Sequence, residues 1–329
     1  MLGLFLFLGN VEPALSETTT RVLKDLAYDT VGNETLDLDL YLPEKSVLTP
    51  TPVVVLIHGG CFSEGDKSDH ESEAQDLVKL GYIAASVNYQ LVPQTRYPAS
   101  LRDVQQAVRW LRQNAKTYNI NPEAVAVIGF SAGGYLASML GVQPLGDRAG
   151  LLDSFSKRVT GVIDFYGRTD FLRPEPSGGF DCAQYYLGSE RTNNPEKYKE
   201  ASVLTYVNPE SSPFVILHGD ADQQVELYHS IKLDKILKLS HVHSKLVLLP
   251  GEGHGFTWKS APQAWIEVRN FLSEVVPVPG ILQSMAIQLR QFTLAAESSF
   301  LGLRDFLWAR GSRSPGAIAP SGKAHRLDK

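Results

Sequence analysis

The chain has 329 residues, of which 43% are hydrophobic and 20% charged, a balance typical of globular proteins with one large α/β domain or two smaller ones. Its formal net charge of −5 at pH 7 argues against general nucleic-acid binding, which needs a basic face. No apolar run reaches the length of about 18 residues that a membrane span needs, so the sequence predicts no transmembrane span.

The first sixteen residues are the first feature along the chain. Residues 2–8 are almost entirely apolar and resemble the apolar part of a secretory signal, and Ala14-Leu15-Ser16 fits a small-x-small cleavage rule. A basic region ahead of the apolar stretch is missing. We expect an apolar leader over 1–16 and a secreted or periplasmic protein, with a cytoplasmic one as the alternative.

Strand patterns follow in chain order. Residues 35–42 alternate between apolar and polar, as in a half-buried strand, and 21–28 is its expected antiparallel partner at the edge of a sheet. Residues 53–57 are apolar throughout, as expected for a central parallel strand that is covered on both faces. Similar runs, which bring the predicted total to eight strands, occupy 83–87, 124–128, 159–165, 214–217 and 246–249.

Helical patterns lie between these strands. The clearest is Ala99 to Tyr118, in which Leu101, Val104 and Val108 begin an apolar stripe at helical spacing. Strands that alternate with helices predict an α/β fold with a mostly parallel sheet and helices on both faces. The other expected helices are His70–Leu80, Ala132–Leu140, Leu227–Leu239 and Ala261–Val275.

Two segments do not fit this alternation. Arg168 to Ser212 is rich in Pro, Gly and aromatic residues, and we expect it to cover a site beyond the carboxyl ends of the strands, with a surface excursion as the alternative. Residues 277–329 carry one amphipathic helical pattern and a basic, Ser/Gly/Pro-rich end that we expect to be disordered. The predicted organisation is thus a leader, a main domain over 17–276 and a tail.

One serine has the context of a nucleophile. Ser131 lies between Gly129 and Gly133, directly after the predicted strand 124–128 and at the start of the predicted helix Ala132–Leu140. A strand that ends in Gly-x-Ser-x-Gly and turns into a helix is typical of the nucleophile elbow of α/β-hydrolases. The turn is strained, and a side chain at either glycine would collide with the neighbouring strand or helix. The sequence therefore predicts an α/β-hydrolase fold with 17–276 as its catalytic domain.

A serine hydroxyl needs a base, and the base needs an acid to orient it. In this fold the order along the chain is Ser, then Asp or Glu, then His. His254 lies in a glycine-rich loop after the last predicted strand and is the expected base. Asp222 follows the strand 214–217 and is the expected acid, with Asp220 as its rival. We expect Asp220 to accept hydrogen bonds from backbone amides in the turn.

Attack on an ester carbonyl creates an oxyanion, which needs backbone N–H donors. One expected donor is Ala132, the residue after the nucleophile. The others should come from the loop after the strand 53–57, where we assign the amides of Gly60 and Cys61, with Gly59 shaping the turn.

The chain has two cysteines, Cys61 and Cys182, and no Cys-x-x-Cys pair that would suggest a zinc or redox site. Two free thiols are the expected state, with one disulfide between them as the alternative. We assign no metal site and no cofactor.

Together these motifs resemble esterases related to hormone-sensitive lipase, and in particular their feruloyl/acetylxylan-esterase-like branch. The resemblance covers about Asp25 to Val275. Cys61 replaces the third glycine of the family pattern and Phe62 its usual Trp, so the Cys61 amide can act as a donor only if its backbone angles suit a residue with a Cβ. The matching segments are 58–62, 65–67, 88–91, 97–99, 103, 107–111, 129–134, 164–167, 218–222 and 253–256.

The resemblance implies a serine carboxylic-ester hydrolase for short acyl groups, such as acetyl or feruloyl esters of plant polysaccharide. The expected partner is a small-molecule or carbohydrate-linked ester, and no nucleic acid. A peptidase like the catalytic domain of prolyl oligopeptidases is the runner-up, although such domains usually follow a β-propeller. An arylformamidase is a further alternative. A binding protein on an inactive hydrolase scaffold is the third, although such proteins typically lack the Ser or the His.

Overall fold

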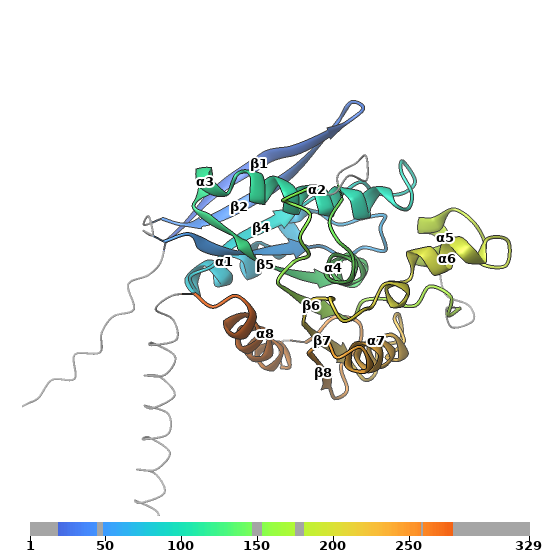
Figure 1. Ribbon diagram of the computed structural model, residues 1–329. Coiled ribbons are helices and arrows are strands. Elements are labelled where there is room, and N and C mark those ends of the chain that lie inside the picture. Colours follow the sequence, from blue (N-terminus) through green and yellow to red (C-terminus); the bar gives the residue numbers. More distant parts are fainter. Residues whose placement is uncertain (1–18, 45–48, 147–152, 175–180, 258, 279–329) are drawn as a thin grey trace, which may run out of the picture. The chain divides into compact units, whose positions relative to one another are not determined.

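In the part of the chain that the structure describes, eight strands form one sheet in the order β1-β2-β4-β3-β5-β6-β7-β8 (Figure 1). β1 and β2 are antiparallel, as are β2 and β4, and all the other neighbours are parallel. The predicted mostly parallel sheet of eight strands with an antiparallel edge is confirmed. The strands are β1 (Thr20–Val31), β2 (Glu34–Pro43), β3 (Thr51–Ile57), β4 (Ile83–Val87), β5 (Ile120–Phe130), β6 (Gly161–Phe165), β7 (Phe214–Gly219) and β8 (Ser244–Leu249).

The computed structural model describes most of the chain, and its described residues belong to one compact unit. The expected leader over 1–16 lies outside the described residues, as does the expected tail helix beyond residue 278. The described ranges are 19–44, 49–146, 153–174, 181–257 and 259–278.

The central strand β3 shows why the sequence there is apolar throughout. All of its residues are buried. Val53, Val55 and Ile57 pack into the core on one face of the sheet, whereas Val54 and Leu56 pack into the core on the other. Since successive side chains of a strand point to opposite faces, a strand covered on both sides needs an apolar residue at every position.

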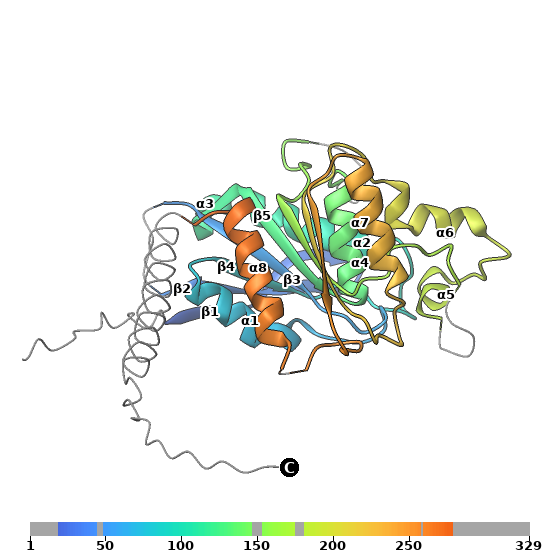
Figure 2. The same cartoon turned by 90° about the horizontal axis from the view of Figure 1, so that it is seen from below.

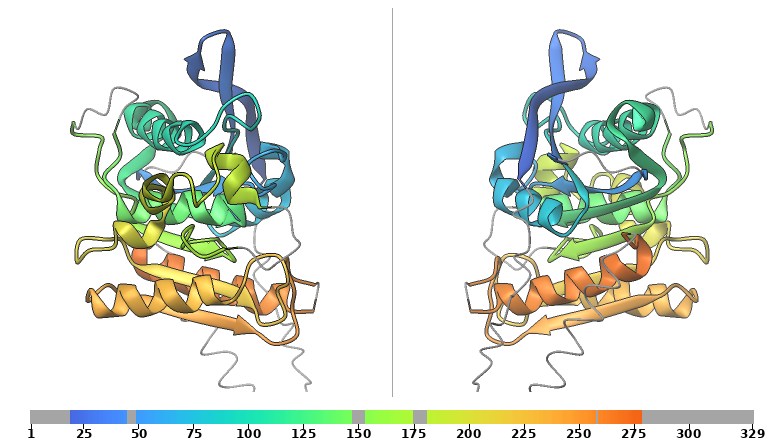
Figure 3. Two further views of the ribbon diagram at one scale, coloured as in Figure 1. Left: turned by 90° about the vertical axis from the view of Figure 1, so that its right-hand side faces the viewer. Right: turned by 90° about the vertical axis from the view of Figure 1, so that its left-hand side faces the viewer.

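Helices cover both faces of the sheet, as Figures 2 and 3 show. Side chains of α2, α4 and α7 contribute to one core, and those of α1 and α8 to the other. None of the described helices is long and apolar enough to cross a bilayer. Their bounds are α1 (Glu71–Lys79), α2 (Ala99–Gln113), α3 (Ala115–Tyr118), α4 (Ala132–Val142), α7 (Tyr228–Leu239) and α8 (Ala261–Val275).

The helix expected over Ala99 to Tyr118 is two helices, α2 and α3, which meet at Asn114. The Asn114 side chain donates a hydrogen bond to the carbonyl of Trp110 at 2.9 Å, in addition to the bond from its own backbone N–H. Asparagine competes in this way with regular helix hydrogen bonding. The apolar stripe continues past this point, which is why periodicity alone did not reveal the break.

The segment between β6 and β7 holds the helices α5 (Cys182–Leu187) and α6 (Pro195–Ala201) and the short 3-10 helix η2 (Val203–Thr205). We call residues 166–213 the insert. In Figure 1, α5 and α6 lie beyond one end of the sheet. The insert leaves the sheet at the carboxyl end of β6, the edge at which ligands bind in α/β proteins. Its role as a cover stays a prediction.

A buried lysine joins the edge hairpin to the rest of the sheet. The Lys67 ammonium lies 3.0 Å from carboxylate oxygens of Asp37 and Asp39 and also pairs with Asp25. Burial alone would lower the pKa of Lys67, but the hydrogen bonds to these three carboxylates raise it above its ordinary value. Lys67 therefore remains charged and compensates acidic groups that would otherwise repel one another.

We expect Lys67→Met to lower the free energy of unfolding by about 3 kcal/mol, because it leaves acidic groups at the hairpin without a cation. Urea unfolding followed by circular dichroism measures this change. Lys79→Met is the matched control: Lys79 is exposed on α1 and pairs only with an exposed carboxylate, that of Asp76. Its effect should stay within about 0.5 kcal/mol. Equal effects of the two substitutions would contradict the role given to Lys67.

Candidate active site

Ser131 stands in the turn between β5 and α4 with φ +55° and ψ −113°. A Cβ on Gly129 would lie 2.0 Å from the Gly133 carbonyl oxygen, and one on Gly133 would lie 2.1 Å from the carbonyl oxygen of Ile57 on β3. Only glycine fits at these contacts. The Ser131 amide donates to the Phe165 carbonyl of β6 at 2.9 Å. The turn has the geometry of a nucleophile elbow.

His254, in the loop after β8, connects Ser131 to Asp222. Its Nε2 lies 2.8 Å from Ser131 Oγ, and its Nδ1 lies 2.8 Å from Asp222 Oδ2. Because the carboxylate only accepts, Nδ1 carries the proton and Nε2 is free to accept from the serine hydroxyl. The structure thus brings together the three side chains that the sequence placed after three different strands.

The environment of Asp222 keeps it ionised. Its second oxygen, Oδ1, accepts hydrogen bonds from the amides of Gln224 at 2.8 Å and Val225 at 2.9 Å. Burial would raise the pKa of this carboxyl, but hydrogen bonds from His218, His254 and the Val225 amide hold it well below its ordinary range. A fixed negative charge therefore faces His254 Nδ1.

Asp220, the rival acid, points elsewhere. Its Oδ1 accepts a hydrogen bond from the Gly251 amide at 2.7 Å. It thus ties the loop after β7 to the loop after β8: Asp220 does accept from a backbone amide, but from one in the next loop and not in its own turn.

His218 is the functional candidate that the sequence analysis left without a role. It is completely buried at the end of β7. Its Nε2 lies 3.0 Å from the Val225 carbonyl oxygen and 3.3 Å from Asp222 Oδ2, and its Nδ1 lies 2.7 Å from Ser230 Oγ. His218 therefore contacts the same Asp222 oxygen, Oδ2, that His254 contacts. Its place four residues before Asp222 is a signal that the sequence offered.

The loop after β3 lies directly beside Ser131. A Cβ on Gly59 would come within 3.3 Å of Ser131 Cβ. The next residues, Gly60, Cys61 and Phe62, have φ values of +95°, +51° and +62°. None of the hydrogen bonds among the described residues uses the amide N–H of Gly60 or Cys61.

Ala132 adds a third amide to this group. It is the first residue of α4, and a first-turn N–H has no acceptor within its own helix. The positive end of the helix dipole lies at the same place. The loop after β3 and the start of α4 thus offer amides to an anion beside the Ser131 hydroxyl.

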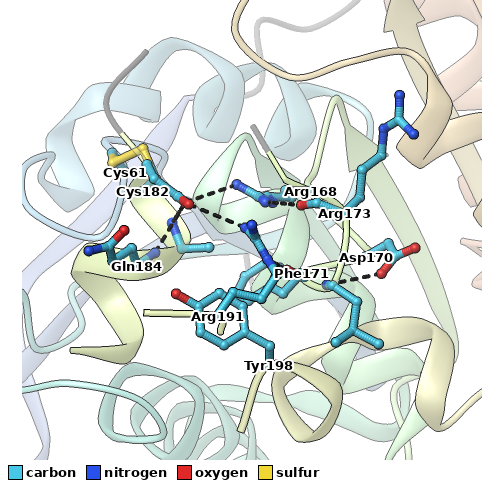
Figure 4. A network of polar contacts seen from close by, with 12 residues as sticks. Cys61, Arg168, Asp170, Phe171, Arg173, Cys182, Gln184, Arg191 and Tyr198 are labelled. Atoms are coloured by element: carbon cyan, nitrogen blue, oxygen red, sulfur yellow. Dashed lines mark hydrogen bonds and ion pairs between the residues drawn. A yellow bond between two sulfur atoms is a disulfide. The ribbon is translucent and has the colours of Figure 1, made fainter. Parts of the chain in front are cut away.

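The expectation of two free thiols is wrong, because Cys61 and Cys182 form a disulfide with a Cα–Cα distance of 5.4 Å (Figure 4). The two cysteines are 121 residues apart in the sequence. They meet because the insert places the first residue of α5 against the loop after β3. This contact between distant segments has no signature in the spacing of the cysteines.

A cavity of about 1060 Å³ opens at this place. Aromatic rings supply much of its wall, and Arg168 supplies a cation, whose pKa burial lowers only to about 10. In the part of the chain that the structure describes, no group of three or more His, Cys, Asp or Glu side chains is placed to hold a metal ion. The lining includes Gly60, Cys61, Phe62, Phe130, Ser131, Ala132, Tyr135, Tyr166, Arg168, Cys182 and His254.

Relatives of this chain are found among known ester hydrolases. The probable carboxylic ester hydrolase LipM of Mycobacterium tuberculosis is 28% identical over 262 residues, which are 76% of this chain and 61% of LipM. The chain thus spans about three fifths of the length of that relative.

Solved structures of other proteins share the fold, and two of them illustrate this. A truncated carbohydrate esterase from gut microbiota superposes with a TM-score of 0.68 at 24% identity, covering 80% of this chain and 99% of its own. An acetyl ester-xyloside bifunctional hydrolase from Caldicellulosiruptor lactoaceticus superposes with a TM-score of 0.63 at 25% identity, covering 74% and 89%.

The family model BD-FAE matches residues 38–237, which are more than half of the chain. The match runs from β2 through the elbow, the insert and the loop that carries Asp222. The α/β-hydrolase fold and the resemblance found from the motifs are thereby confirmed. This chain belongs to the BD-FAE family, within the esterases related to hormone-sensitive lipase.

Proposed function

We propose that this chain hydrolyses carboxylic esters, with Ser131 as nucleophile, His254 as general base and acid, and Asp222 as the group that orients His254. The observation that carries the proposal is the pair of 2.8 Å contacts that join the three side chains at the wall of a cavity. The low pKa of Asp222 supports its role as a permanent anion beside the imidazole.

The geometry supports the following course of reaction. Ser131 Oγ attacks the ester carbonyl while His254 Nε2 takes the hydroxyl proton. The amides of Gly60, Cys61 and Ala132 bind the oxyanion, and Gly59 leaves room for the loop to approach the serine. His254 then gives its proton to the departing alcohol. A water repeats these steps on the acyl-enzyme and releases the acid.

We also propose a carbohydrate-linked ester, such as an acetyl or feruloyl ester of plant polysaccharide, as the substrate. The solved structure that is 25% identical is described as an acetyl ester-xyloside hydrolase, and the cavity of about 1060 Å³ exceeds what a simple acetate ester fills. The aromatic rings of Phe130 and Tyr166 at its wall suit contact with a sugar or a feruloyl ring.

Export of the protein, to the periplasm or the medium, is a further part of this proposal. The disulfide between Cys61 and Cys182 supports it, because disulfides persist mainly in oxidising compartments. A polysaccharide substrate would be met in the same place.

A panel of p-nitrophenyl esters from acetate to decanoate, run beside aminoacyl-nitroanilides, tests the activity. We expect ester turnover by the wild type and a loss of kcat of at least about 10⁴-fold in Ser131→Ala, because the nucleophile is removed. Ser273→Ala on α8, whose hydroxyl bonds only a carbonyl of its own helix, is the control and should keep full activity. Ester turnover that survives in Ser131→Ala, or turnover of the nitroanilides alone, would contradict the proposal.

The two aspartates offer a matched pair of variants. Asp222→Asn should lower kcat by about 10⁴-fold, because the amide favours the wrong His254 tautomer. Asp220→Asn keeps an oxygen that can accept from the Gly251 amide, so kcat should stay within about threefold of wild type. Steady-state kinetics with p-nitrophenyl acetate compare them. The reverse ranking would show that the assignment of the acid is wrong.

Acetylated xylo-oligosaccharides test the carbohydrate part of the proposal. We expect kcat/KM for acetate release to equal or exceed that for p-nitrophenyl acetate, because the sugar chain gains contacts in the cavity that a small aryl ester leaves unused. Released acetate is measured by a coupled assay, and Ser131→Ala corrects for spontaneous loss. Turnover of the aryl acetate alone would agree with the proposed ester hydrolysis and would contradict the proposed carbohydrate substrate.

A further inference from the structure

We propose that the Cys61–Cys182 disulfide and the helix α5 form a clamp that positions the oxyanion loop, here Gly59 to Phe62, for catalysis. The inference rests on the proposed function, since it assigns the clamp to the amides that bind the oxyanion. Cys61 and Cys182 act through the backbone of the loop and are positioning residues.

The loop has a conformation that its own sequence does not favour. Cys61 and Phe62 have φ values of +51° and +62°, in the left-handed region where a Cβ is unfavourable. Glycine would adopt such angles without penalty. A strained backbone of this kind persists only where the surrounding structure holds it.

Both strained residues are held by the same helix. Cys61 is bonded to Cys182, and the Phe62 ring stacks on Tyr186 with centroids 3.8 Å apart and an interplanar angle of 5°. Cys182 and Tyr186 are four residues apart on α5, so they lie on one face of it. One face of α5 therefore receives two neighbouring side chains of the oxyanion loop.

The start of α5 is firmly anchored, as Figure 4 shows. Asp181 caps the helix by accepting hydrogen bonds from the Ala183 and Gln184 amides at 3.0 and 3.1 Å. The same carboxylate lies 3.3 Å from Arg168 Nη1 and 3.2 Å from Arg191 Nη2. Two guanidinium groups thus fix the cap to other parts of the insert.

The end of α5 is anchored to the main domain. The Tyr186 hydroxyl lies 2.7 Å from Ser100 Oγ at the start of α2, and the Tyr186 carbonyl accepts from the Tyr97 amide at 3.1 Å. Ser100 and Tyr186 are both buried. A helix fixed at both ends can hold the loop that is attached to it.

The clamp has a chemical consequence at the site. Without the disulfide, an alanine or a free cysteine at position 61 can relax to negative φ, which rotates the peptide groups of the loop and turns an amide away from the oxyanion. A glycine at position 61 is not destabilised at positive φ, so it can keep the loop conformation without the disulfide. A disulfide that served only as a general cross-link would not distinguish alanine from glycine in this way.

The test compares two double variants that both lack the disulfide, Cys61→Ala/Cys182→Ala and Cys61→Gly/Cys182→Ala, which differ by one methyl group. With p-nitrophenyl acetate we expect the alanine variant to lose about 10- to 100-fold in kcat with KM within about twofold, because loss of an oxyanion donor acts on the transition state. The glycine variant should keep a kcat at least about fivefold above that of the alanine variant, because glycine adopts the positive φ of this position without penalty.

Reduction of the wild type provides a second measurement that needs no substitution. A water-soluble phosphine and one water convert the disulfide to two thiols, while the phosphine becomes its oxide. Under the phosphine, the kcat of the wild type should fall to about that of the alanine variant. The glycine variant has no disulfide, so its kcat should not change. Reduction of the wild type therefore tests the clamp even if the alanine variant fails to fold.

Amide hydrogen exchange reports on the loop without any turnover. The Ser63 and Glu64 amides donate to the Gly60 carbonyl at 2.9 and 3.1 Å, so their exchange should be faster in the alanine variant than in the glycine variant. Equal kcat and equal exchange in the two double variants would overturn the clamp. If the wild type turned over no ester but exchange followed the expected order, the clamp would stand and the proposed function would fall.

Discussion

The strained backbone at Ser131 is the constraint on which the rest of the site depends. A residue with a Cβ at φ +55° stays there only because several neighbours leave it no alternative. β5 lies between β3 and β6, and the register pairs Ile57 with Gly129 and Phe130 with Phe165. At this turn Gly133 of α4 lies against the carbonyl of Ile57 at the end of β3, and the Ser131 amide donates to the carbonyl of Phe165. The sheet holds the turn from both sides.

The position of that turn also decides where the other groups can come from. Parallel strands end at one edge of the sheet, so the loops after β3, β5, β7 and β8 share that edge. They carry the oxyanion loop, Ser131, Asp222 and His254. Asp222 can be an anion in this partly enclosed place because the donors around it, including His218, outweigh the effect of burial on its pKa. Topology and electrostatics thus support the same arrangement of residues.

Much of this could be predicted from the sequence, because the signals are local. Full apolarity of the central strands, the elbow motif and the order of Ser131, Asp222 and His254 each depend on a few neighbouring residues. The features that the sequence does not reveal depend on contacts between distant segments. The disulfide joins residues 121 positions apart, and the support that His218 gives to Asp222 exists only once the loop after β7 has turned back. The break at Asn114 was missed for another reason, since the apolar stripe runs on through it.

Cys61 combines a local sequence signal with a contact between distant segments. Read along the chain, it is a departure from a glycine pattern that places an oxyanion donor in doubt. In the folded protein the same side chain is bonded to α5, which holds the backbone angle that a glycine would have adopted freely. Cys61 and Cys182 both line the cavity, so one stretch of its wall and the oxyanion loop are a single covalent unit. A substrate that pushed α5 outward would therefore move the amides to which we assign the oxyanion.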